Sequence, residues 1–184
     1  MMRADTSGMG QGGWYGRLGA RWERRIGASG VTPATPAPRV QFNVARGIAA
    51  SRAEVWAAAM AMTCPPDAGC EAIVGAPESG PGSRHVHLGG PVPPYGLRSV
   101  TYTEVVEMHE GSSYAVHTHG GTWGQEETWL FADLWNGTTN VTILGTHAHA
   151  YPNVPVDMMQ THVDAIVRQA LERLAEQVTG SAPA

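Results

Sequence analysis

Lysine is absent from this sequence of 184 residues, and all 12 of its basic residues are arginines. That absence excludes chemistry that needs a lysine side chain, namely Schiff-base formation, lysine general-base catalysis and the Walker-type phosphate loop. Cysteine is scarce as well, since only Cys64 and Cys70 occur, with five residues between them. This spacing fits neither a zinc ribbon nor a Cys-x-x-Cys redox site, so we expect two reduced thiols.

Long hydrophobic runs are also missing. No stretch approaches the ~18 uncharged apolar residues of a membrane span, and no apolar stretch follows Arg3 as it would in a secretory signal. We therefore expect no membrane span and a cytoplasmic location. Hydrophobic residues make up 42% of the sequence, which is enough for one core, whereas charged residues at 15% fall below the ~25% of an average domain.

Charge and composition divide the chain near residue 39. Residues 1–39 carry six arginines against two acidic residues, a balance of +4, and end in a proline-rich stretch typical of a linker. Residues 40–184 carry six arginines against 14 acidic residues, a balance of −8. We predict a basic Gly/Pro-rich arm over 1–39 and one folded domain over 40–184. The acidic domain argues against nucleic-acid binding, which needs a basic surface.

The arm contains an apolar stripe at helical spacing, formed by Trp14, Leu18, Trp22 and Ile26 and interrupted by Arg25. Such a helix either binds a membrane surface or a protein partner, or packs on the acidic domain of its own chain. A protein partner for the arm is therefore one of the open interpretations.

From residue 40 the pattern becomes regular. Val40, Phe42 and Val44 alternate with less apolar residues, which predicts a half-buried strand. Ser51 and Glu54 form a capping box that opens a helix ending near residue 62. Strand-like runs separated by turn residues follow at 71–76, 83–89, 98–108, 112–119, 126–135 and 139–150.

Short turns join these runs, and the Asn136-Gly137 pair is typical of a hairpin, so we expect an antiparallel meander. One long helix over 157–178 closes the pattern, and Asp157 with Gln160 can cap its start. Its predicted apolar stripe consists of Met159, Val163, Ile166, Ala170, Leu174 and Val178. A strand, a helix, six strands and a long final helix define an α+β protein.

This order of elements resembles the START-like/SRPBCC superfamily, whose members include polyketide cyclases/aromatases and many ligand carriers. The resemblance covers about 40–178 and rests on Val40 to Val44, Glu54-Val55-Trp56, Gly82-Ser83-Arg84, the 137–142 run and the final helix. It implies a helix-grip fold, in which a curved seven-stranded antiparallel sheet wraps around the long C-terminal helix. Such a fold would enclose a cavity for an apolar or aromatic ligand.

Six of the eight histidines occur as His-x-His pairs, at 85/87, 117/119 and 147/149. The two members of a pair share one face of a strand. The three pairs fall on alternate strands of the meander, towards the C-terminal end of each strand, so they would gather at one end of the sheet. Alternate strands lie about 9–10 Å apart, so three pairs cannot reach one metal ion, although strong curvature could bring two together. We assign no metal site and no cofactor.

Strand parity suggests which pairs face the interior. His147 and His149 share parity with Val141 and Ile143, which favours the interior. The pairs at 85/87 and 117/119 have the opposite parity to their apolar neighbours and are expected to face water. Arg84 would then point inward as an anion or carbonyl anchor, or lie at the surface.

The resulting hypothesis is a small-molecule cavity protein that acts as a polyketide cyclase/aromatase-like enzyme. His147, His149, His119 and Arg84 are the predicted proton-shuttling residues, because an imidazole transfers protons near neutrality. Of the adjacent Glu126 and Glu127, at most one can enter the cavity. The predicted ligand-contacting residues are Tyr95, Trp123, Trp129, Tyr151 and His162. A non-catalytic carrier or sensor of a hydrophobic ligand and a His-x-His metal-binding protein are the alternatives.

Overall fold

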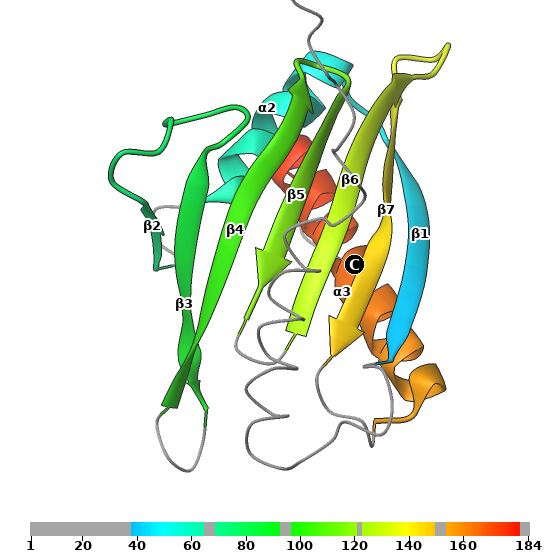
Figure 1. Ribbon diagram of the computed structural model, residues 1–184. Helices are drawn as coiled ribbons and strands as arrows, with labels where there is room; N and C mark the ends of the chain where they lie inside the picture. Colours follow the sequence, from blue (N-terminus) through cyan, green and yellow to red (C-terminus); the bar gives the residue numbers. More distant parts are fainter. Residues whose placement is uncertain (1–37, 65–68, 93–96, 121–122, 150–153, 181–184) are drawn as a thin grey trace, which may run out of the picture. The chain divides into compact units, whose positions relative to one another are not determined.

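The computed structural model describes residues 38–64, 69–92, 97–120, 123–149 and 154–180. Its sheet has seven antiparallel strands in the order β1-β7-β6-β5-β4-β3-β2 (Figure 1). The strands are β1 (Arg39–Ile48), β2 (Cys70–Ala72), β3 (Arg84–Val92), β4 (Leu97–His109), β5 (Ser113–His119), β6 (Trp123–Asp133) and β7 (Thr139–His149). The helices are α2 (Arg52–Thr63) and α3 (Val156–Thr179). The predicted α+β helix-grip fold is confirmed.

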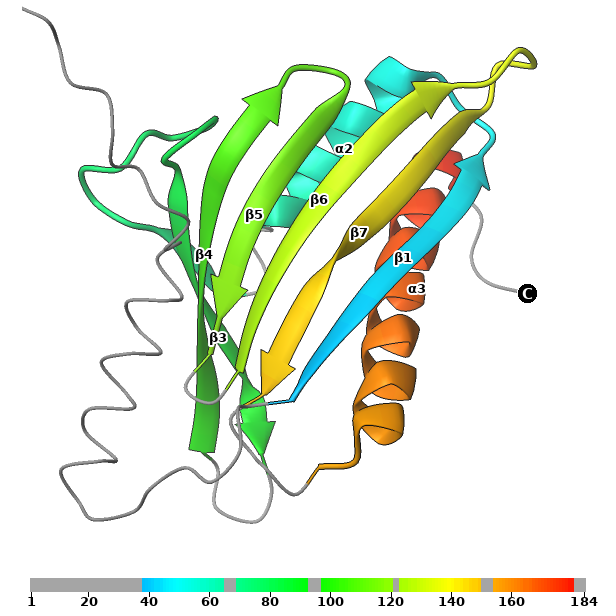
Figure 2. The ribbon, with the colours of Figure 1, turned by 45° about the vertical axis from the view of Figure 1, so that its right-hand side comes forward.

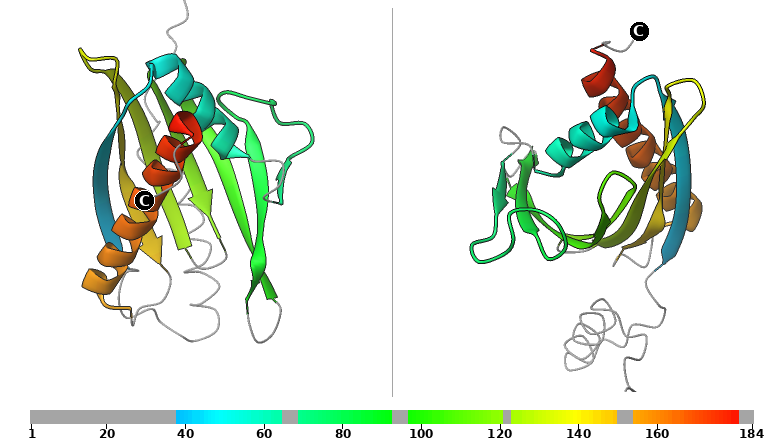
Figure 3. Two further views of the ribbon diagram at one scale, coloured as in Figure 1. Left: turned by 180° about the vertical axis from the view of Figure 1, so that it is seen from behind. Right: turned by 90° about the horizontal axis from the view of Figure 1, so that it is seen from above.

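The sheet is strongly curved, and both helices lie against its concave face (Figures 2 and 3). Strands β2 to β7 follow one another as a meander, and β1 pairs with β7 at the far edge. The long helix α3 crosses the hollow of the sheet beside β1 and β7 (Figure 3). Residues on the concave side therefore face the helices, while those on the opposite side face outward.

Two helix starts show how local sequence sets the elements. Ser51 caps α2 as predicted, since its hydroxyl accepts from the Glu54 N–H at 3.4 Å and the Glu54 carboxylate accepts from the Ser51 N–H at 3.0 Å. The cap predicted for α3 is wrong, because Pro155 precedes its first residue and no side chain caps it. Gln160 instead donates to the Gln41 carbonyl of β1 at 2.8 Å. This contact ties α3 to the edge strand.

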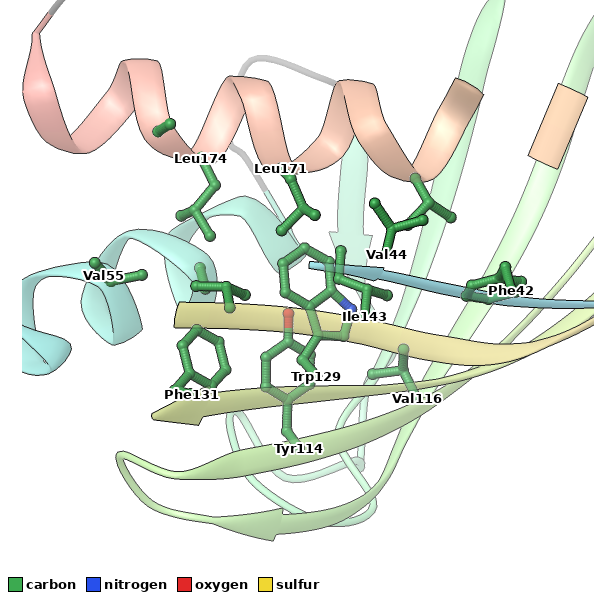
Figure 4. Packing of buried hydrophobic residues seen from close by; sticks show 14 of the residues in the cluster. Phe42, Val44, Val55, Tyr114, Val116, Trp129, Phe131, Ile143, Leu171 and Leu174 are labelled. Atoms are coloured by element: carbon green, nitrogen blue, oxygen red, sulfur yellow. The ribbon is translucent and has the colours of Figure 1, made fainter. Parts of the chain in front are cut away.

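The core lies between the concave face and the helices. Figure 4 shows aromatic side chains of β5 and β6 rising towards α3 and packing beneath Leu171 and Leu174. The buried residues of α3 are Met159, Val163, Val167, Leu171, Leu174 and Ala175. Ile166, which the sequence placed on the buried stripe, is 47% exposed. The true stripe passes through Val167 and Leu171, one position further along the helix from Ile166 and Ala170.

The two cysteines are joined in a disulfide, so the expectation of reduced thiols is wrong. Cys64 lies at the C-terminal cap of α2, and Cys70 is the first residue of β2. The bond therefore fastens the end of α2 to the edge strand of the sheet.

The arm over 1–39 lies almost entirely outside the described residues, and its boundary stays a prediction. Within the described ranges, no helix combines the length and the apolar character needed to span a bilayer.

Candidate functional site

A row of polar side chains crosses the concave face of the sheet. The strand register places His85, Thr103, Thr118, Gln125 and His147 opposite one another, from β3 to β7. Side chains of aligned residues in neighbouring strands share one face of a sheet. The Thr103 and Thr118 hydroxyl oxygens lie 3.2 Å apart, and His147 Nδ1 lies 3.1 Å from Gln125 Oε1. We call these five residues the polar row.

Glu127 lies two residues beyond Gln125 on β6, and its carboxyl joins the polar row. Oε2 accepts from the Gln125 side-chain amide at 2.6 Å, and Oε1 accepts from the Trp129 indole N–H at 3.0 Å. Glu127 is half-buried, and burial raises the pKa of its carboxyl, while the bonds from Trp129 and Gln125 partly oppose that rise. The pKa of Glu127 therefore lies above that of an exposed glutamate, in the direction of neutral pH.

These contacts also define the protonation of His147. A carboxylate only accepts hydrogen bonds, so the Gln125 NH2 group must face Glu127 and its carbonyl oxygen must face His147. The Nδ1 atom of His147 is then the donor, which leaves Nε2 of the neutral ring without a proton. Burial, followed by the neighbouring His149 and His162, lowers the pKa of His147. Its imidazole is thus a neutral ring with a basic Nε2.

A pocket of about 220 Å³, partly open to solvent and called the cavity below, lies between the polar row and the two helices. A cavity of ~150 Å³ can hold benzene, so this one has room for one or two fused rings. Most of its polar lining comes from the sheet, Thr63 of α2 being the exception, and its apolar lining comes from both the sheet and the helices. The lining residues are Ala59, Met62, Thr63, His87, Thr103, Tyr114, Val116, Thr118, Glu127, Trp129 and Ala170.

Two further histidines face this side of the sheet. His87 lines the cavity, and its Nε2 lies 3.6 Å from the Cys70 sulfur of the disulfide. His85 is only 7% exposed, and its buried Nδ1 has no hydrogen-bond partner among the described residues. Burial lowers the pKa of both histidines. Both rings are therefore neutral at physiological pH.

The predicted pair on β7 points to the concave side as expected. His147 is buried, and Trp123 stacks on its ring with centroids 5.7 Å apart. The ring of His149 lies 6.3 Å from that of His147. His162 is exposed on α3, yet it lies near enough to lower the pKa of both histidines. None of these four residues borders the cavity itself, and His147 reaches it only through Gln125 and Glu127.

The orientation expected for the pair at 85/87 is wrong, and so is the inward position considered for Arg84. Arg84 lies on the outer face and forms an ion pair with Glu104 at 3.0 Å. His119 also lies on the outer face, where its ring packs against Tyr102 with centroids 4.8 Å apart. The pair at 85/87 also stands at the start of β3 and not at its end, because the strand continues to Val92.

The remaining predicted residues fall into two groups. Trp129 is buried and lines the cavity, so it is placed to contact a ligand there. Tyr95 and Tyr151 lie outside the described residues. In the parts of the chain that the structure describes, no three residues of the types His, Cys, Asp and Glu are grouped so that they could hold a metal ion.

The sequence hypothesis missed two polar residues that line the cavity, Glu127 and His87, and also Gln125, which bonds to Glu127. For Gln125 and Glu127 the parity of β6 contained the signal. Residues 125 and 127 share parity with Trp129 and Phe131, both buried, so Glu127 and not Glu126 had to point inward.

Comparisons with known proteins show the fold. No family model matches this sequence, and no curated protein matches it either. A START superfamily protein from Mycobacterium smegmatis is similar in structure, with a TM-score of 0.58 and 18% identity over 76% of this chain and 97% of that chain. Ara h 8.0201 has a TM-score of 0.58 and 12% identity over 78% of this chain and 100% of that one.

A third similar structure is DynU16, a protein from the dynemicin biosynthetic locus, with a TM-score of 0.52 and 16% identity. The similarity covers 74% of this chain and 46% of that chain. The topology and these structures show that the chain has a helix-grip fold similar to that of the START superfamily protein.

Proposed function

We propose that this protein binds a small hydrophobic or aromatic molecule in the cavity between the sheet and the helices, and that it catalyses proton transfer on that molecule. The observation that carries the proposal is the buried carboxyl of Glu127 on the wall of a cavity of about 220 Å³. An apolar cleft with a few convergent polar groups is the usual form of a small-molecule site. The START-like fold and its ligand carriers support this interpretation.

Glu127 is the group that exchanges protons with the ligand. An acid whose pKa is raised towards neutrality serves both as a base and as an acid at working pH. As a base it removes a proton from the carbon next to a ligand carbonyl, and as an acid it returns that proton to a hydroxyl that leaves as water. Removal of this proton and loss of water are proton-transfer steps in the cyclisation and dehydration of a polyketide-like molecule.

Gln125 and His147 are positioning residues in this scheme, because they act through Glu127 and not on the ligand. The bond from Gln125 fixes one carboxyl oxygen, so the Glu127 carboxyl is held in one orientation at the cavity wall. His149 lies beside His147 at the same end of β7. The catalytic roles predicted for His119 and Arg84 stay predictions, and their outer-face position gives them no contact with the cavity.

Proton exchange on 2-tetralone tests the proposal. This ketone has two fused rings, which suit the cavity volume, and an acidic CH2 group between its aromatic ring and its carbonyl. We expect the full chain to accelerate exchange of that CH2 into D2O, measured by NMR. The Glu127→Gln variant should bind the ketone without accelerating exchange. Glu126→Gln is the matched control, because this neighbouring glutamate is exposed on the outer face.

The outcomes separate the enzyme from the carrier. Binding without faster exchange in the wild type would support a non-catalytic carrier of a hydrophobic ligand. Absence of binding would contradict the proposed function as a whole. Equal exchange rates in the wild type and in Glu127→Gln would show that another group moves the proton.

A further inference from the structure

The carboxyl of Glu127 has no positively charged partner in the described part of the chain. The sequence has no lysine, and every described arginine is exposed at the surface. Arginines that form ion pairs do so with surface acids, as Arg46 does with Glu172 and Arg52 with Asp133. The inward-facing histidines cannot supply the charge, because burial lowers the pKa of each and favours the neutral ring.

The hydrogen bonds around Glu127 suit its ionised form. The Trp129 indole N–H is a donor only, and the Gln125 amide presents its NH2 group, so both carboxyl oxygens accept. Each of these oxygens keeps a second lone pair, so the carboxyl can still take up a proton or face a cation. Where it is ionised, it is a charge at the cavity wall, and such a charge is costly unless a charge of opposite sign faces it.

The same cavity is lined by two aromatic side chains, whose rings can add to the binding of a cation. Trp129 and Tyr114 both line it, and their rings are stacked with centroids 5.4 Å apart and an angle of 16° between their planes. The face of an indole or phenol ring attracts a positive charge, most strongly where water is excluded. The carboxylate and the aromatic surface therefore point to ligands of the same chemical class.

We propose that the ligand of this cavity carries a positively charged nitrogen within or beside one or two rings, and that this charge pairs with Glu127. The inference rests on the proposed function, since it names the ligand class of the same cavity. A cation adds pairing with the carboxylate to the burial of its rings, whereas a neutral ligand of equal shape gains only the burial. The cavity should therefore discriminate by charge between molecules that it accepts equally by size.

Two probes of nearly identical shape test this inference: 1-methylquinolinium, which is a cation, and 1-methylnaphthalene, which is neutral. Binding to the full chain is measured by calorimetry and by quenching of tryptophan fluorescence. We expect the wild type and the Glu126→Gln control to bind the cation at least about tenfold more tightly than the neutral probe. The Glu127→Gln variant should lose this preference while it keeps its affinity for 1-methylnaphthalene, which also shows that its cavity is intact.

Each other outcome overturns the inference in a distinguishable way. If the wild type binds the neutral probe as tightly as the cation, the ligand is not selected by charge, and the proposed function survives without this ligand class. The same holds if Glu127→Gln retains the preference for the cation. If the wild type binds neither probe, the inference fails together with the proposed cavity function.

Discussion

Replacing Gly145 of β7 by alanine should destabilise the protein strongly, because no room exists for a Cβ atom at this position. The added atom would overlap the carbonyl oxygen of Glu126 and would lie 2.8 Å from Cζ of Phe42 and 2.9 Å from Cα of Glu127. Two of these three neighbours are backbone atoms of β6, so they cannot move by rotating a side chain. Either β7 or β6 must shift, and the pairing of Glu127 with Gly145 is disturbed.

The expected cost is at the upper end of the range for overpacking, about 3 kcal/mol. In a protein of this size one kcal/mol lowers the melting temperature by about 2–4 °C, so the variant should melt about 6–12 °C below the wild type. Thermal unfolding followed by circular dichroism and unfolding in urea would both measure the change. The shift of Glu127 should also weaken binding of 1-methylquinolinium.

Gly47→Ala is the matched control on β1. A Cβ atom at residue 47 would meet only the Thr138 methyl carbon, at the ordinary distance of 3.4 Å. Alanine is also preferred over glycine within a strand, so this variant should be neutral or more stable by up to about 1 kcal/mol. If Gly145→Ala and Gly47→Ala unfold at the same urea concentration, β6 and β7 do not approach each other closely at Gly145.

Three other perturbations have expected outcomes. Thr139→Val should cost about 1–3 kcal/mol in urea unfolding, because Thr139 is fully buried and its hydroxyl donates to the Ala50 carbonyl at 2.8 Å. Thr139→Ser keeps the hydroxyl and should retain most of the stability. Equal losses in the two variants would contradict a stabilising role of this hydrogen bond. Reducing the Cys64–Cys70 bond with dithiothreitol should lower the free energy of unfolding by about 2 kcal/mol, since the disulfide closes a short loop. An unchanged urea midpoint after reduction would contradict this stabilising effect. Glu127→Gln should be more stable than the wild type at high pH, because the wild type loses stability as the pH rises through the raised folded-state pKa of Glu127. The difference in unfolding free energy should vanish in acid. A difference that does not change with pH would refute this cause.

The inward-facing histidines of β3 and β7 add a pH dependence of opposite sign. Burial lowers their folded-state pKa below the unfolded value of about 6.5, so the unfolded chain binds more protons once the pH falls below that value. Stability should therefore decline as the pH drops from about 6.5 through the folded-state pKa values. Urea unfolding between pH 7.5 and 5 measures this decline, and a constant midpoint would show that these rings are not buried as neutral groups.

The order of elements was predictable because turn residues and alternating apolar residues mark it directly. Asn136-Gly137 predicted the hairpin between β6 and β7, and Gly137 does adopt the positive φ of 75° that such a turn requires. The Ser51 and Glu54 capping box likewise located the start of α2. These signals are local, so they do not depend on which face of the sheet becomes the interior.

The orientation of β3 was not predictable in the same way. The parity rule assumes that inward positions are apolar, and it assigned the inside to Val86 and Leu88. Leu88 is 43% exposed, while His85 and His87 face the helices. The rule fails here because the inward positions of β3 approach a cavity with polar groups and not a packed core. On β6, where Trp129 and Phe131 are packed in the core, the same rule orients the strand correctly.

The same contrast separates a binding cavity from a packing defect. Voids left by imperfect packing are lined by apolar side chains and stay dry, since no group in them holds water. The cavity in this protein instead carries a carboxyl, an imidazole and two threonine hydroxyls on its sheet side. Filling it with apolar side chains would stabilise the fold, because the carboxyl of Glu127 costs free energy where it stands. Stability therefore gives no reason for a carboxyl at position 127, and this is why we assign Glu127 to the proposed ligand site.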